Sequence, residues 1–131
     1  MSCAVRYYSR SGNTKVLAEY IARGAGTSAV SVDKANAPLK QTVDVLFVGG
    51  ALYAYGLDRF LKDYLKDIDP QKVGKAVLFS STWISRHSLD LMRSALKAKG
   101  IKVEEETLYV KGKPGPEQLE AALAFGKKFS K

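Results

Sequence analysis

Six residues near the start of the chain, Ser9-Arg10-Ser11-Gly12-Asn13-Thr14, carry the clearest chemical signal in the sequence. They follow a short apolar run and precede a segment with helical periodicity, so we expect them to form the turn between a strand and a helix. Backbone N–H groups at a helix start, together with short side-chain donors, can hold a phosphate group, whose negative charge the helix dipole favours. The spacing fits neither the Walker pattern GxxxxGK[ST] nor the dinucleotide-binding pattern GxGxxG. We predict a phosphate-binding loop, with an ordinary N-capped turn as the alternative.

Together with the preceding Tyr8, this stretch resembles the (S/T)-x-(S/T)-G-x-T phosphate loop of flavodoxins and related flavoproteins that bind FMN. The likeness extends over residues 1–131 as a single domain, through the order of strands and helices, the length, and Gly49-Gly50 after the third strand. The resemblance implies FMN as the cofactor. It also implies that Ser9, Arg10, Ser11, Gly12, Asn13 and Thr14 wrap the FMN phosphate, with Arg10 adding a fork of donors.

In this family the loop after the third strand covers one face of the flavin ring. The corresponding residues here are Ala51-Leu52-Tyr53-Ala54-Tyr55. An aromatic side chain suits that position because a flat ring gains from offset stacking. Tyr53 is the favoured candidate, and we expect one of the two tyrosines to pack on the following helix instead.

The loop after the fourth strand, Ser80–His87, includes Ser81-Thr82-Trp83, and its family counterpart holds the pyrimidine end of the flavin and often the second ring face. Trp83, the only tryptophan, is the candidate for that contact; the alternative is a rim residue packed on the neighbouring helix. Arg86 and His87 follow, without a glycine or a carboxylate. A cation near the flavin would stabilise its anionic reduced form and favour two-electron chemistry. We expect no catalytic side chain and no metal site.

The elements that must position these loops alternate along the chain. Short runs rich in Val, Tyr, Phe or Leu predict strands at residues 3–8, 29–32, 43–48, 76–79 and 102–110. Apolar residues at three- and four-residue steps predict helices between them, but residues 34–42 favour a loop or a very short helix. The pattern predicts an α/β fold: a flavodoxin-like three-layer α/β/α sandwich with a five-stranded parallel sheet, order 2-1-3-4-5.

Composition and charge narrow the range of partners and cellular compartments that we expect. The chain has 131 residues and a formal charge of +8, which suits anionic partners. Residues 58–75, however, mix lysines with Asp58, Asp63, Asp67 and Asp69, as on a solvated helix face, which argues against nucleic acid. No apolar run could span a membrane, no signal peptide is apparent, and the single Cys3 allows no internal disulfide. We expect a cytoplasmic protein, either monomer or homodimer. Arg6, inside a predicted strand, needs a partner that the sequence does not name.

Three functions stay open at this stage. The first is an FMN-binding electron carrier that works with redox partner proteins. The second is a small FMN-dependent oxidoreductase passing hydride from NAD(P)H to a quinone or similar small-molecule electron acceptor. The basic charge favours it, and the small size opposes it. The third is a flavodoxin-like binding domain without flavin.

Overall fold

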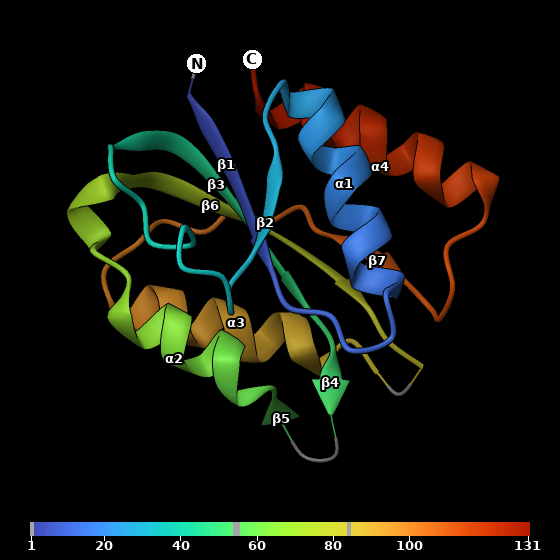
Figure 1. Ribbon diagram of the computed structural model, residues 1–131, viewed down its shortest axis with the longest axis horizontal. Helices are drawn as coiled ribbons and strands as arrows, with labels where there is room; N and C mark the ends of the chain where they lie inside the picture. The colour runs from blue at the N-terminus through green and yellow to red at the C-terminus, as the bar shows by residue number, and fades with distance from the viewer. Residues whose placement is uncertain (1, 54–55, 84) are drawn as a thin grey trace.

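The computed structural model describes residues 2–53, 56–83 and 85–131 (Figure 1). Within those residues, every helix is too short or too polar to cross a membrane. The strands are β1 (Cys3–Tyr7), β2 (Ala29–Ser31), β3 (Val43–Gly50), β4 (Leu52–Tyr53), β5 (Gly56–Leu57), β6 (Val73–Ser81) and β7 (Leu108–Val110). The helices are α1 (Asn13–Ala25), α2 (Arg59–Asp67), α3 (His87–Ala98) and α4 (Pro116–Phe129), with a short 3-10 turn at Pro70–Lys72.

Five parallel strands form the main sheet in the order β2-β1-β3-β6-β7. Numbered along the chain without the short β4–β5 pair, this is the predicted order 2-1-3-4-5. The chain leaves β1 toward β2 on one side and returns to β3 on the other, so strand order reverses between β1 and β3. Because the strands are parallel, their carboxyl ends share one edge of the sheet, and loops that follow different strands can meet there.

Helices cover both faces of the sheet. Along β3, Leu46 and Val48 belong to one buried cluster, whereas Val45 and Phe47 belong to the other. Successive side chains of a strand point to opposite faces, so this alternation fills two cores at once. α2 and α3 cover the first core, and α1 and α4 cover the second (Figure 1). The predicted three-layer sandwich is confirmed, and burial on both faces explains the unbroken apolar run in β3.

α1 and α4 approach so closely that their backbones touch. A Cβ atom added at Gly24 would lie 2.1 Å from the carbonyl oxygen of Leu123, and one added at Gly126 would lie 2.1 Å from that of Ile21. Any side chain at either glycine would therefore force the two helices apart.

The predicted strand at 102–110 is only partly correct. Val103 makes an isolated bridge to Ala76, and regular pairing begins again only at β7. Between them, Arg93 of α3 donates from Nη1 to the carbonyl of Glu104 at 3.1 Å and from Nη2 to that of Glu105 at 3.4 Å. These carbonyls are satisfied by a side chain instead of a neighbouring strand, so the ladder is interrupted. β6 is longer than predicted, and Gly49 and Gly50 lie within β3 and not after it.

Residues 34–42 form turns without a helix, the first of the two predicted alternatives. This segment gives Arg6 its partner, because the Nε atom of Arg6 donates to the carbonyl of Ala37 at 2.7 Å. Burial lowers the pKa of the Arg6 guanidinium. The charged side chain of Arg6 in β1 thus holds residues 34–42, the connection between β2 and β3, in place.

Candidate functional site at the carboxyl edge of the sheet

Gly12 fixes the shape of the loop between β1 and α1. It is the residue before α1, and its backbone is left-handed, with φ 93° and ψ −8°. A left-handed backbone costs a residue with a side chain about 1–2 kcal/mol. A Cβ atom added at Gly12 would meet nothing within 4 Å. Glycine is therefore required here by backbone conformation and not by lack of space.

Two serine hydroxyls brace this loop. Oγ of Ser9 accepts a hydrogen bond from the N–H of Gly12 at 3.0 Å, and Oγ of Ser11 accepts a longer one from the N–H of Asn13 at 3.4 Å. A hydroxyl that accepts a hydrogen bond can still donate its own proton to another acceptor. Thr14, in the first turn of α1, is buried, and first-turn N–H groups have no partner inside their helix. The loop can thus offer both O–H and N–H donors to one anion.

The side chain of Arg10 is bound to a different loop. Its guanidinium donates to Oδ2 of Asp58 from Nε at 2.9 Å and from Nη2 at 2.5 Å, and this hydrogen bonding raises the pKa of Arg10. Asp58 is buried, and its Oδ1 caps α2 by accepting from the N–H of Phe60 at 2.8 Å. One carboxylate therefore joins the β1–α1 loop to the start of α2. Donation from Arg10 to a phosphate is not seen in this arrangement and stays a prediction.

Tyr53 brings the segment after β3 into contact with the loop between β1 and α1. It belongs to a two-stranded antiparallel hairpin, β4–β5, which the sequence did not predict, and it pairs there with Gly56. Its hydroxyl accepts a hydrogen bond from the N–H of Arg10 at 3.0 Å, and the Arg10 guanidinium lies 4.1 Å from the centre of its ring. Burial raises the pKa of this phenol. The tyrosine predicted to stack on a planar ligand thus lies directly beside the predicted phosphate loop.

Buried hydroxyls hold the end of β6 and the loop that follows it against their neighbours. Oγ of Ser80 donates to the carbonyl of Gly50 at 2.6 Å, and Oγ of Ser81 donates to that of Gly112 at 2.5 Å. The backbone of Thr82 bonds with Val110 and Gly112, both at 3.2 Å. The side chains of Ser81 and Thr82 are buried, so they shape this loop from below.

Trp83 stands at the rim of the same edge. It is 67% exposed, and its ring lies over Gly112, where an added Cβ atom would be 2.3 Å from the ring. The tryptophan therefore packs on the loop after β7. Its contact with a ligand stays a prediction.

The structure thus brings together part of the predicted set. Tyr53 and the Ser9–Thr14 stretch meet, whereas Trp83 lies with the loop after β7. Ala51 and Leu52 are both buried at 8% exposure, so their side chains support the hairpin. Ala54 and Tyr55 lie outside the described residues.

Sequence reasoning missed two residues. Asp58 was counted among the solvated charges of 58–75, but it is buried and paired; its position just before a helical pattern was the available signal, because aspartate is a favoured N-cap. Gly112 supports Trp83 from another strand end. No local pattern points to that contact, because the two residues are far apart in the sequence.

Solved structures share this architecture over nearly the whole chain. A flavodoxin from the domain Archaea matches with a TM-score of 0.86 at 20% identity, covering 99% of this chain and 96% of that one. Flavodoxin 1 from Bacillus cereus, in its oxidised form, matches with a TM-score of 0.78 at 24% identity, covering 98% and 97%. The chain has the flavodoxin fold. The flavodiiron protein from Giardia intestinalis contains the same fold as a part: the TM-score is 0.85 at 14% identity, over 98% of this chain and 35% of that one. No protein-family model and no curated protein matches the sequence.

Within the flavodoxin fold, the loops described above occupy one definite place. Gly12 follows β1 and Tyr53 follows β3, so the two flank the point where strand order reverses. Doubly wound sheets bind their ligands in the crevice at that point. The candidate site is therefore the place in the fold where a ligand is expected.

Proposed function

We propose that the chain binds FMN at the carboxyl edge of its sheet and acts as an electron carrier. The observation that carries this proposal is the contact between the Gly12 loop and Tyr53. It places donors for a phosphate next to an aromatic ring, at the switch between β1 and β3. In flavodoxins this switch is the FMN site.

The residues present fit such a group. The hydroxyls of Ser9 and Ser11 and the N–H groups at the start of α1 would hold the phosphate, where the helix dipole also favours negative charge. Tyr53 would cover one ring face, and Trp83 is exposed and free to cover the other. Bound FMN would supply reversible uptake of electrons. The protein's part is to bind and orient it, so no side chain need be catalytic.

Flavin binding is tested by titrating FMN into the flavin-free protein and following flavin fluorescence. Riboflavin, which lacks the phosphate, is the matched ligand. Because charge-assisted hydrogen bonds to the phosphate contribute about 1.5–3 kcal/mol, FMN should bind at least about tenfold more tightly than riboflavin. Equal affinity would contradict the phosphate site, and no binding of either compound would favour the flavin-free binding domain.

The oxidoreductase alternative has one observation in its favour. Arg86 lies at the same edge, with its guanidinium 5.0 Å from the centre of the Tyr109 ring. Lys111 and Lys113, which follow Tyr109 closely in the sequence, are exposed. Cations near the flavin would favour its two-electron anionic reduced form. Anaerobic reductive titration separates the two functions. Reduction in two one-electron steps supports the carrier, and a single two-electron step with steady NADPH oxidation by a quinone supports the enzyme.

A further inference from the structure

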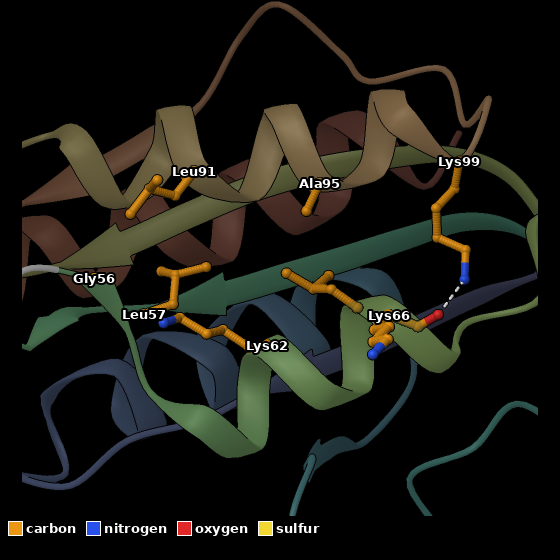
Figure 2. Close-up of a pocket in the computed structure, with 8 residues that line it drawn as sticks. Gly56, Leu57, Lys62, Lys66, Leu91, Ala95 and Lys99 are labelled. Atoms are coloured by element: carbon orange, nitrogen blue, oxygen red, sulfur yellow. Dashed lines mark hydrogen bonds between the residues drawn. The ribbon is translucent and has the colours of Figure 1, made fainter.

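A groove lies between α2 and α3 (Figure 2). These two helices lie on the face of the sheet opposite to α1 and α4 (Figure 1). Its volume is about 500 Å³, within the range of about 300–1,000 Å³ that small-molecule sites occupy. The apolar part of its lining comes from both helices and from β5. These residues are Leu57, Leu65, Leu91 and Ala95.

The charged part of the lining is entirely cationic. Lys62, Lys66 and Lys99 line the groove and no carboxylate does; in the described part of the chain none of the three forms an ion pair. Asp63 and Asp67, next to these lysines in sequence, line a separate hollow on the other side of α2. The charges of α2 are therefore sorted between its two sides, and the α3 side carries unneutralised positive charge above an apolar floor.

Lysines also bound the groove at its ends. The ammonium group of Lys99 donates to the carbonyl of Lys66 and crosses one end, as Figure 2 shows. At the other end, the ammonium group of Lys62 lies 3.5 Å from the position of a Cβ atom added at Gly56. A peptide chain running on past either end would meet these side chains, so the shape favours a short occupant.

We propose that this groove binds a small apolar organic anion, of the class of medium-chain carboxylates. The alkyl part would lie on the four apolar side chains and gain from leaving water, and the carboxylate would pair with the lysines. A neutral alkane derivative would gain only the first contribution, and an alkylammonium ion would be repelled. The groove borders the carboxyl-edge site through Gly56 and Leu57 of the β4–β5 hairpin, but neither Tyr53 nor any residue of Ser9–Thr14 lines it.

Isothermal titration calorimetry of the full chain with octanoate tests the proposal, with 1-octanol and octylammonium as matched ligands. We expect one octanoate per chain, bound at least about tenfold more tightly than either comparison ligand. Equal affinity for octanol, or several weak octanoate sites per chain, would overturn the proposal, because both indicate general attraction to a basic apolar surface. Failure of octanoate with binding of an acidic peptide would overturn it in favour of a protein partner.

Variants locate the site. Lys66→Gln and Lys99→Gln should each weaken octanoate binding by about fivefold and leave octanol binding unchanged. Leu91→Gln, at a half-buried position on α3, should weaken both ligands. Lys97→Gln is the matched control, because Lys97 is exposed on α3 but outside the groove. Equal loss in the Lys97 variant would refute the assignment. Circular dichroism shows whether each variant is folded.

Discussion

At the scale of single residues, the site depends on a few atoms whose places are fixed by backbone conformation. Gly12 has a left-handed φ with open space around it, and Gly26, at the other end of α1, has the same two properties. The two glycines therefore differ in location and not in the strain that a side chain would add. Substitutions at Gly12 and Gly26 can therefore be compared to separate the free-energy cost of a strained backbone from the effect of the Gly12 loop on ligand binding.

Gly12→Ala and Gly26→Ala should each lower the free energy of unfolding by about 1–2 kcal/mol, measured by urea denaturation of the flavin-free protein. Only Gly12→Ala should also weaken FMN binding, because only that loop would hold the phosphate. An equal loss of FMN affinity in both variants would show that binding responds to overall stability and not to the loop.

Tyr53 has two separable parts. Its ring would stack on the flavin, whereas its hydroxyl occupies the N–H of Arg10, which a phosphate oxygen would otherwise accept. Tyr53→Phe should therefore retain or raise FMN affinity, by up to about tenfold, and Tyr53→Ala should lower it by about tenfold or more. Fluorescence titration measures both. A similar loss in the two variants would assign the binding role to the hydroxyl.

Tyr64 carries a buried hydroxyl that completes no hydrogen bond in the described residues. Burial raises the pKa of its phenol, and the nearby Arg6 guanidinium acts in the opposite direction. A raised folded-state pKa contributes stability that is complete below about pH 10 and is lost as the pH rises further. Tyr64→Phe should leave the free energy of unfolding at pH 7 unchanged or about 1 kcal/mol higher, and should reduce its fall in alkali. Urea denaturation at several pH values, with Tyr20→Phe as control, measures this. A large loss at pH 7 would show that the hydroxyl is bonded.

At the scale of elements, the site is assembled by contacts between the loop after β1, the β4–β5 hairpin and the start of α2. Asp58 joins two of them, because one of its oxygens caps α2 and the other binds Arg10. Arg10 is more than half exposed, so solvent weakens the ion pair, and the cap should carry much of the stabilisation.

Asp58→Ala should lower the free energy of unfolding by about 1–3 kcal/mol, whereas Asp58→Asn, which keeps an acceptor for the cap, should cost about 1 kcal/mol less. Urea denaturation measures both values. Asp69→Ala is the control, since Asp69 also accepts from a backbone N–H but is exposed and forms no ion pair within the described residues. If Asp58→Asn is as costly as Asp58→Ala, the charge and not the cap is the main contribution.

The elements that sequence predicted well are those whose signals are local and strong. β3 and β6 are apolar on both faces, and Gly100, just after α3, has the left-handed φ of 81° that is typical of a glycine ending a helix. The β4–β5 hairpin escaped notice because strands of two residues show no alternation. The break before β7 depends on Arg93, whose contact with the Glu104 carbonyl comes from another element. In the candidate site, the loop at Gly12 could be predicted from residues adjacent in the sequence, but its contact with Tyr53 could not.

At the scale of the whole molecule, positive charge gathers around the carboxyl edge. The exposed cations on loops or helix starts at that edge are Arg10, Arg59, Arg86, Lys111 and Lys113. Asp58, in the same region, is buried and already paired, and the exposed carboxylates at these positions, Asp33, Asp90 and Glu117, are fewer than the cations. An electron-transfer partner that approaches this edge should therefore be acidic.

Electron transfer to a small acidic iron–sulfur protein, measured by stopped flow with the FMN-loaded chain, should slow by about tenfold between about 0.01 and 0.15 M ionic strength. Transfer to a basic cytochrome should become faster over the same range. Lys111→Glu should slow the first reaction, whereas Lys127→Glu, at the far end of α4, should have little effect. Equal effects of the two substitutions would mean that net charge, and not this edge, guides the partner.

The close contact of α1 with α4 has a consequence for synthesis. The two helices lie about ninety residues apart in the chain, yet together they cover one face of the sheet. At ribosomal rates of about 5–20 residues per second, α1 waits roughly 5–20 s for its partner. During that interval the growing chain exposes apolar side chains such as Leu17 and Phe47, which belong to the unfinished core. Until α4 has been made, this face of the sheet therefore presents apolar surface of the kind that promotes aggregation.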